Sequence, residues 1–188
     1  MDFKNKNVAV LGFGAEGASA VNFMLGHKAR VSVFDVRSED KFDREQISRL
    51  KEKGVGFRFD KYPESFLGFD CVVRSPGISP LSQVFEKIKK EAITVTSATK
   101  IFFDLCPVPI IGVTGTKGKG TTSTLIYEML KKQGIDAYLG GNIGLPPLEF
   151  LASLKPDSWV VLELSSSRYS ESGNSEVSRY NSFRINKY

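Results

Sequence analysis

A glycine-rich turn that carries two lysines is the segment of this chain with the clearest chemical capacity. It reads TGTKGKGTT over residues 114–122. The apolar run Val108–Val113 before it is typical of a buried strand, and Ser123–Lys132 after it has apolar residues at helical spacing. Glycines in such a turn let backbone N–H groups approach phosphate oxygens, and the helix N-terminus adds positive potential. We therefore predict a phosphate cradle, in which Lys119 lies against the β- and γ-phosphates of a nucleotide and a threonine hydroxyl binds Mg²⁺.

The spacing of this turn departs from the common phosphate-loop pattern G-x-x-x-x-G-K-[ST]. Val113 stands where that pattern begins with glycine, Gly120 stands where it has Ser or Thr, and Thr121 comes one residue late. The pattern alone leaves the Mg²⁺ ligand open, with Thr121 as our candidate hydroxyl, and a turn that binds no ligand is the alternative. The residues that we predict to contact the nucleotide are Gly115, Thr116, Lys117, Gly118, Lys119, Gly120, Thr121 and Thr122.

A second glycine-rich segment, GFGAEG over residues 12–17, follows a predicted strand at 7–12 and opens a predicted helix at 14–25. Asp35 ends the next predicted strand. This arrangement is typical of dinucleotide-binding folds, where glycines allow a tight turn and close phosphate approach and the acid reaches a ribose hydroxyl. The alternative is a turn of the same shape that binds nothing.

The elements around these two turns predict an α/β protein. Strands and helices alternate over residues 1–97, which indicates a Rossmann-like parallel sheet covered on both faces. Residues 98–166 read as the first part of a phosphate-loop ATPase-type α/β domain. Residues 167–188 are rich in Ser, Arg, Asn and Glu without an apolar period, so we predict a disordered tail there.

Composition excludes several classes of function. The chain has 188 residues and a net charge of +5, but its basic residues are scattered, which argues against nucleic-acid binding. No apolar run is long enough to span a bilayer, and no signal peptide follows Met1. Cys71 and Cys106 lack CxxC spacing and read as core thiols of a reducing compartment. We expect a cytoplasmic monomer without a membrane partner.

Six segments in one order carry a family resemblance, namely residues 8–17, 33–37, 72–78, 114–122, 140–144 and 163–166. The series resembles the Mur ligase superfamily, and within it the D-glutamate-adding branch. The resemblance implies a cytoplasmic ligase of peptidoglycan precursor synthesis that uses ATP and Mg²⁺. Its substrates would be UDP-N-acetylmuramoyl-L-alanine and D-glutamate, joined through an acyl phosphate.

The resemblance also implies roles for individual residues. The first domain would hold the uridine nucleotide, with Asp35 and Arg37 at the uracil and ribose, and an acceptor–donor pair suits the mixed edge of uracil. Glu163 would bind Mg²⁺ and, with Lys119, act in catalysis. The other residues that the resemblance places at the substrate are Gly14, Ser75, Pro76, Gly77, Asn142 and Ser165.

Alternatives remain open at this point. The sequence KGTT over 119–122 also resembles folylpolyglutamate synthases, and the first domain alone would suit an NAD-dependent oxidoreductase. After Ser166 the resemblance fails. Three features of the family have no counterpart in this sequence: the strand with a metal-linked histidine, the modified lysine, and the C-terminal domain. We therefore expect this chain to be inactive as a ligase by itself, and a non-catalytic nucleotide-binding remnant is a further alternative.

Overall fold

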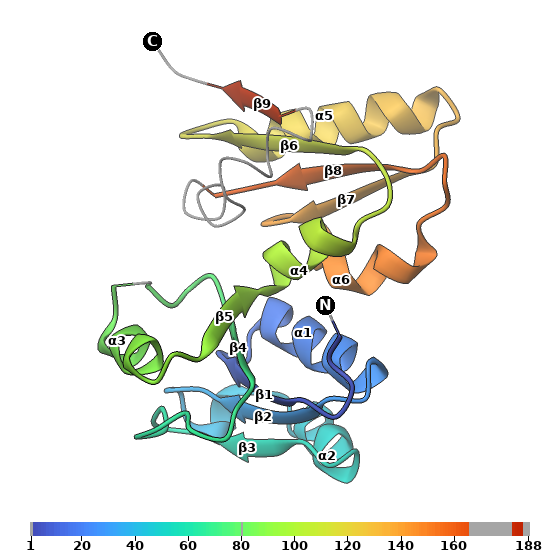
Figure 1. Cartoon of the computed structure of the whole chain (residues 1–188). Helices are drawn as coiled ribbons and strands as arrows, with labels where there is room; N and C mark the ends of the chain where they lie inside the picture. The colour runs from blue at the N-terminus through green and yellow to red at the C-terminus, as the bar shows by residue number, and fades with distance from the viewer. Residues whose placement is uncertain (1, 80, 166–181, 186–188) are drawn as a thin grey trace. The chain divides into compact units, whose positions relative to one another are not determined.

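The computed structural model describes residues 2–79, 81–165 and 182–185. The chain divides into two compact units, Met1–Ala98 and Thr99–Tyr188. Each unit is built on a parallel β-sheet accompanied by helices (Figure 1). The predicted α/β class with parallel sheets is therefore confirmed. Within the described residues no helix is both long and apolar enough to cross a membrane.

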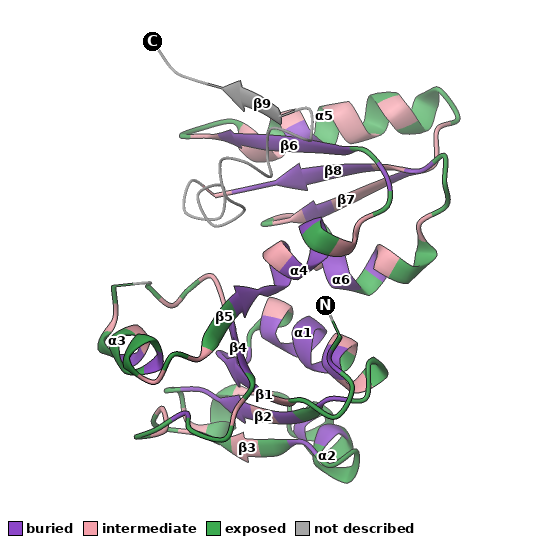
Figure 2. Cartoon of the chain, in the orientation of Figure 1, coloured by how far each residue is buried: buried purple, intermediate pink, exposed green. Residues whose placement is uncertain are grey.

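The first unit has a five-stranded parallel sheet in the order β3-β2-β1-β4-β5. The central strands β1 and β4 are buried over almost their whole length, whereas no residue of the edge strand β3 is buried (Figure 2). The strand order reverses between β1 and β4, and ligands of open α/β sheets bind outside the carboxyl ends at such a point. Its elements are β1 (Asn7–Leu11), α1 (Ala15–Gly26), β2 (Arg30–Phe34), the 3-10 turn η1 (Glu39–Lys41), α2 (Arg44–Glu52), β3 (Gly56–Arg58), β4 (Cys71–Arg74), α3 (Gln83–Lys90) and β5 (Thr94–Ser97).

The second unit has a four-stranded parallel sheet in the order β7-β8-β6-β9. Ile111, Val113 and Val161 form its buried centre, and Ile126 and Leu130 of α5 pack against them. Its elements are α4 (Ala98–Leu105), β6 (Ile110–Gly115), α5 (Lys119–Lys132), β7 (Ala137–Gly141), α6 (Pro147–Phe150), the 3-10 turn η2 (Leu151–Ser153), β8 (Trp159–Glu163) and β9 (Ser182–Ile185).

The start of α5 differs from the sequence expectation. The helix begins at Lys119 rather than at Ser123, directly after Gly118, whose φ of 75° lies in the left-handed region. Glycine takes that conformation without steric cost, so the chain turns into the helix inside the glycine-rich segment. As a result Lys119 and Gly120 lie in the first helical turn, where backbone N–H groups have no helical partner.

The predicted disordered tail is wrong for one short segment. Ser182–Ile185 form β9, which pairs in parallel with β6 from Gly112 to Gly115. Strand pairing uses backbone N–H and C=O groups, so the polar composition that suggested disorder does not prevent it. The rest of the segment, residues 167–181 and 186–188, lies outside the described residues.

Close packing at the first turn explains one glycine of the GFGAEG segment. A Cβ added at Gly17 would lie 2.0 Å from the carbonyl oxygen of Gly12, far inside contact distance. The backbone of α1 therefore passes directly over the turn that follows β1. This contact fixes where the helix N-terminus, capped at Gly14, lies relative to the carboxyl end of β1.

Candidate nucleotide and phosphate sites

The carboxylate of Asp35 holds the turn after β1 in the first unit through hydrogen bonds to Phe13 and Arg37. Its Oδ2 accepts from the backbone N–H of Phe13 at 2.7 Å and from Arg37 Nη2 at 2.8 Å. Its Oδ1 accepts from the backbone N–H and the Nε of Arg37 at 2.9 and 3.0 Å. A carboxylate has about four lone-pair positions, so these four bonds use its whole acceptor capacity.

Electrostatics support the same interpretation of Asp35. Burial of the side chain raises its pKa, but the hydrogen bonds from Arg37 and from the Phe13 N–H outweigh burial and hold the pKa below its ordinary value. Arg37 itself is half exposed, and its guanidinium lies 4.5 Å from the centre of the Phe42 ring. Asp35 thus orients the turn and Arg37, and Arg37 presents the exposed charge.

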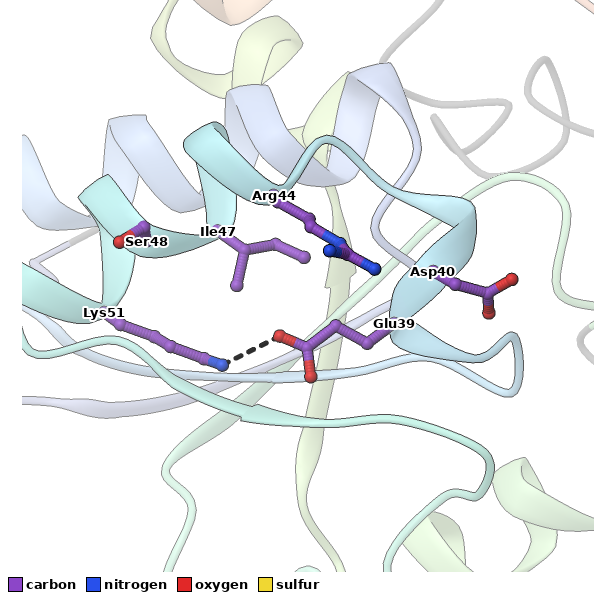
Figure 3. Close-up of a pocket in the computed structure, with 6 residues that line it drawn as sticks. All are labelled: Glu39, Asp40, Arg44, Ile47, Ser48 and Lys51. Carbon is purple, nitrogen blue, oxygen red and sulfur yellow. Dashed lines mark hydrogen bonds and ion pairs between the residues drawn. The ribbon is translucent and has the colours of Figure 1, made fainter.

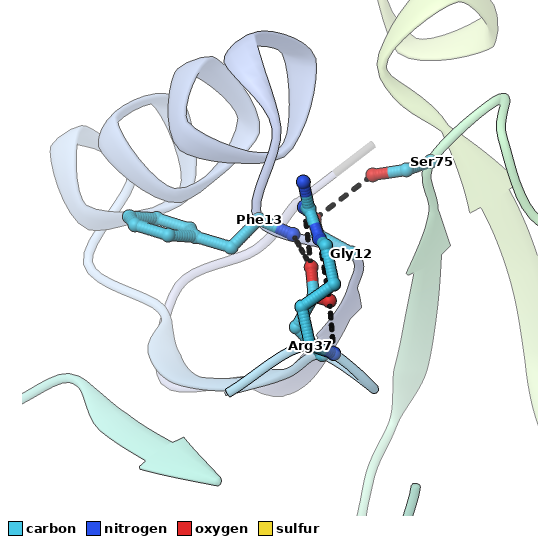
Figure 4. A network of polar contacts seen from close by, with 5 residues as sticks. Gly12, Phe13, Arg37 and Ser75 are labelled. Carbon is cyan, nitrogen blue, oxygen red and sulfur yellow. Dashed lines mark hydrogen bonds and ion pairs between the residues drawn. The ribbon is translucent and has the colours of Figure 1, made fainter. Parts of the chain in front are cut away.

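Ser75 connects the turn after β4 to the turn after β1. Its hydroxyl donates to the carbonyl oxygen of Gly12 at 2.9 Å (Figure 4). Its backbone N–H donates to the carbonyl oxygen of Leu11. Sequence reasoning missed the neighbour Arg74, which is buried and donates from Nη1 to the carbonyl oxygen of Ile78 at 2.7 Å. The sequence signal that could have identified Arg74 is its position as a charged residue at the end of an apolar strand. Arg74 holds the turn in which Pro76 and Gly77 lie.

The first unit therefore gathers several predicted residues at the carboxyl ends of adjacent strands. Asp35 follows β2, Ser75 follows β4, and Gly14 follows β1 and caps α1. Gly14 and Gly77 are exposed, and Ser75 and Pro76 are half-buried. The predicted contacts of these residues with a uridine nucleotide remain predictions.

Glu163 is the central feature of the second unit. It ends β8, in register between Val113 of β6 and Gly141 of β7, and only 6% of it is exposed. Its one hydrogen bond to a side chain comes from Asn142 Nδ2 at 3.5 Å, and among the described residues it makes no ion pair. A buried carboxylate is costly without a cation or donors around it. Binding of a cation beside Glu163 would therefore stabilise its carboxylate.

The phosphate loop lies beside this carboxylate. A Cβ added at Gly120 would be 4.0 Å from Glu163 Oε2, so the first turn of α5 faces Glu163. Lys117 and Lys119 pair with no carboxylate among the residues that the structure describes. Two unpaired lysines and a helix N-terminus give this place a positive potential that suits phosphate.

The remaining predicted residues of the second unit have varied surroundings. Thr116 and Thr121 are exposed, whereas Thr122 and Ser165 are half-buried. Ser123, which the sequence did not single out, is fully buried, and its hydroxyl has no hydrogen-bond partner among the residues that the structure describes. A buried hydroxyl without a partner is unusual, and it marks a polar position within the first turns of α5.

The residues present fit a magnesium–nucleotide complex. Mg²⁺ prefers oxygen ligands and is usually bound by one or two carboxylates together with substrate phosphates, rather than by a cage of protein ligands. Glu163 supplies one buried carboxylate, and within the described residues no group of three or more His, Cys, Asp or Glu side chains could hold a metal. Glu163 and the loop N–H groups match the donor set that such a complex needs.

A separate surface cavity of about 460 Å³ lies between η1 and α2 (Figure 3). Two of its lining charges form an ion pair, because Lys51 Nζ lies 2.9 Å from Glu39 Oε1, and Asp40 pairs at 3.3 Å with Lys41, which does not line the cavity. None of the predicted site residues lines it. The lining residues are Glu39, Asp40, Arg44, Ile47, Ser48 and Lys51.

Each of the two units is an α/β fold in which a glycine-rich turn joins the carboxyl end of a parallel strand to a helix. Residues 6–97 match the family model for the Mur ligase MurD-like N-terminal domain. Residues 113–184 match the model for the Mur ligase middle domain. The chain belongs to the Mur ligase family.

Two similar curated relatives are both named UDP-N-acetylmuramoylalanine--D-glutamate ligase. The Clostridium kluyveri protein is 40% identical over 170 residues, which cover 88% of this chain and 37% of the relative. The Acetivibrio thermocellus protein is 40% identical over 164 residues, which cover 87% of this chain and 35% of the relative. The chain thus spans little more than a third of the length of these relatives.

The similarity to solved structures is lower in sequence identity than the similarity to these relatives. A crystal structure of UDP-N-acetylmuramate:L-alanyl-gamma-D-glutamyl-meso-diaminopimelate ligase from Neisseria meningitides is 18% identical, with a TM-score of 0.49. The match covers 84% of this chain and 52% of that chain.

Asp35→Asn is expected to lower the free energy of unfolding of the first unit by about 1.5–3 kcal/mol at neutral pH, because charge-assisted hydrogen bonds are lost. The folded pKa of Asp35 is depressed, so its stabilisation is present above the unfolded pKa of about 3.9 and is lost as the pH falls through the folded pKa. Urea unfolding of wild type and variant, followed by circular dichroism from neutral to acid pH, measures this difference.

The matched control for this experiment is Asp40→Asn, which removes an exposed acid that follows the same strand. Because its ion pair with Lys41 is exposed, this substitution should change the free energy of unfolding far less than Asp35→Asn does. A stability difference between wild type and Asp35→Asn that stays constant down to acid pH would contradict the role given to this carboxylate.

Proposed function

We propose that this chain carries the uridine-nucleotide and ATP-binding parts of a ligase that adds D-glutamate to UDP-N-acetylmuramoyl-L-alanine in the cytoplasm. The reaction belongs to peptidoglycan precursor synthesis, and it proceeds by phosphorylation of the substrate carboxylate and attack of the D-glutamate amine on the acyl phosphate. The observation that carries the proposal is the buried Glu163 carboxylate, which faces the first turn of α5 and forms no ion pair with any residue that the structure describes. The names and identities of the relatives support the choice of substrates.

The second unit would bind ATP through the loop that precedes α5. Backbone N–H groups of the first helical turn bind the phosphate oxygens, and Lys119 adds a charge-assisted contact. Glu163 would hold Mg²⁺, with Thr121 as the predicted hydroxyl ligand. The cation, when bound, neutralises charge on the phosphoryl group that is transferred. Lys119 contributes to the same charge stabilisation from a fixed position, which is the main way that proteins accelerate phosphoryl transfer.

The first unit would bind the uridine nucleotide at the carboxyl ends of β1, β2 and β4. Gly14 leaves the N-terminus of α1 open to a pyrophosphate, since apart from its chain neighbours no described residue comes within 4 Å of a Cβ added there. Arg37 supplies exposed N–H donors for the uracil or ribose, and Asp35 holds that guanidinium in place. Ser75 holds the Pro76–Gly77 turn against the turn at Gly12.

The acceptor capacity of Asp35 argues against the oxidoreductase alternative. An NAD-binding fold uses the acid at this position to accept hydrogen bonds from ribose hydroxyls. Here all four acceptor positions of Asp35 are taken by Phe13 and Arg37. A ribose could bind in that way only by displacing the guanidinium.

The preference for a uridine nucleotide gives the first test. Calorimetric titration of the chain with UDP-N-acetylmuramoyl-L-alanine should give tighter binding than titration with NAD, because Arg37 offers donors where NAD requires acceptors. UDP alone serves as a control for the contribution of the sugar and peptide. Tighter binding of NAD would contradict the proposed substrate.

Lys119→Ala should weaken ATP binding by about 1.5–3 kcal/mol through loss of a charge-assisted contact. The measurement is calorimetric titration of ATP into each variant, with folding checked by the fluorescence of Trp159, the single tryptophan, on β8. Lys131→Ala in the last turn of the same helix is the control and should bind ATP like the wild type. Equal ATP affinity in folded Lys119→Ala would remove this lysine from the site.

A further inference from the structure

Four phenylalanine side chains form a closed aromatic cluster beside the turn after β1 in the first unit. Phe13 contacts Phe42 and Phe57, with ring centres 5.6 and 5.2 Å apart. Phe59 completes the cluster through contacts with Phe42 at 5.3 Å and with Phe57 at 5.7 Å. Aromatic pairs at such distances favour particular relative orientations of their rings. Phe13 is buried and the other three are half-buried, so the cluster extends from the core to the surface.

Phe42 is the member of the aromatic cluster that contacts Arg37. The 3-10 turn η1 ends at Lys41, and the N–H of Phe42 donates to the carbonyl oxygen of Glu39 at 3.2 Å. This turn folds the chain back, and the guanidinium carbon of Arg37 lies over the Phe42 ring, 4.5 Å from its centre. A cation within about 6 Å of a ring centre is attracted to the face of the ring.

The guanidinium of Arg37 is therefore held both at its edge and at its face. At the edge, Nε and Nη2 donate to Asp35 at 3.0 and 2.8 Å. One face lies over the Phe42 ring. A guanidinium has five N–H donors, so three of them remain outside the pair with Asp35. Because the side chain is half exposed, those donors can be reached by a ligand.

Contacts on an edge and on a face restrain the guanidinium in different directions. The bonds to Asp35 fix the position of the edge, and the ring of Phe42 limits tilting of the plane about that edge. An exposed arginine without such contacts samples many rotamers, and a ligand that binds it must order the side chain at a cost in free energy. Arg37 is ordered by Asp35 and Phe42 before any ligand binds.

We propose that Phe42 is a positioning residue for nucleotide recognition, because its ring holds the guanidinium plane of Arg37 so that the remaining donors face acceptor atoms of a uridine nucleotide. The inference rests on the proposed function of the first unit and deepens it. Phe42 acts through Arg37 and does not itself contact the nucleotide. Its contribution is a lower cost of ordering Arg37 when the nucleotide binds.

The test is calorimetric titration of UDP into the full 188-residue chain and its variants, with folding of each variant checked by circular dichroism. Phe42→Leu keeps an apolar side chain but removes the ring face, and it should weaken UDP binding about fivefold, as expected for loss of a cation–π contact. Phe42→Tyr keeps the ring face and should bind UDP within about twofold of the wild type. Phe57→Leu is the matched control, because Phe57 belongs to the same cluster and its ring contacts are with Phe13 and Phe59. It should also bind UDP like the wild type.

A second background separates positioning of Arg37 from general packing. Arg37→Gln removes the guanidinium plane and its charge, so the Phe42 ring no longer has a cation to hold. Arg37→Gln should itself weaken UDP binding. In that background the further change Phe42→Leu should alter UDP affinity by less than about twofold, because two residues that act through one contact are not additive.

Other outcomes overturn the inference in distinguishable ways. If Arg37→Gln weakens UDP binding and Phe42→Leu does not, Asp35 alone positions the guanidinium, and the proposed function stands without the inference. If Phe57→Leu weakens binding as much as Phe42→Leu, or if Phe42→Tyr binds as poorly as Phe42→Leu, the effect comes from packing of the cluster and not from positioning. If the wild-type chain binds no UDP, the proposed function fails together with the inference.

Discussion

A carboxylate that is removed from water needs cations or N–H donors around it. The first unit of this chain supplies those donors itself, whereas the second unit leaves most of them to a ligand. In each unit a parallel strand ends near a buried acid, Asp35 after β2 and Glu163 on β8. Asp35 is surrounded by four donors from its own unit. From the side chains that the structure describes, the Glu163 carboxylate receives one long hydrogen bond, which comes from Asn142. The first acid is therefore part of the scaffold, and the second is available to a ligand.

The backbone around each acid is organised by close approach. Gly17 lies against the carbonyl of Gly12 in the first unit, and a Cβ at Gly141 would lie 2.2 Å from the carbonyl oxygen of Glu163 in the second. Because only glycine allows such close contacts, the backbone at these two positions can lie directly against the end of a neighbouring strand or its turn. Since the carboxyl ends of parallel strands share one edge of a sheet, each helix N-terminus comes to lie beside a polar residue from a neighbouring strand. The same geometry thus supplies a candidate phosphate-binding turn in both units.

Much of this arrangement could be predicted from the sequence, because apolar periodicity and glycine position are local signals. The order of strands and helices, both glycine-rich turns, and Glu163 at a strand end follow from them. What could not be predicted depends on contacts between distant residues. The saturation of Asp35 requires Phe13 and Arg37 together, and the pairing of β9 depends on backbone groups that composition does not reveal. The early start of α5 depends on the left-handed Gly118.

The central claim is that Glu163 is held unpaired for a cation and its nucleotide. The most direct measurement is the unfolding free energy of Glu163→Gln, followed by the fluorescence of Trp159 on the same strand, without ligand and with Mg²⁺ and ATP. Removing an uncompensated buried charge should leave the ligand-free second unit as stable as the wild type or more stable, while most of the stabilisation by Mg²⁺ and ATP disappears. A clear loss of stability without ligand, or full stabilisation by Mg²⁺ and ATP, would contradict the account.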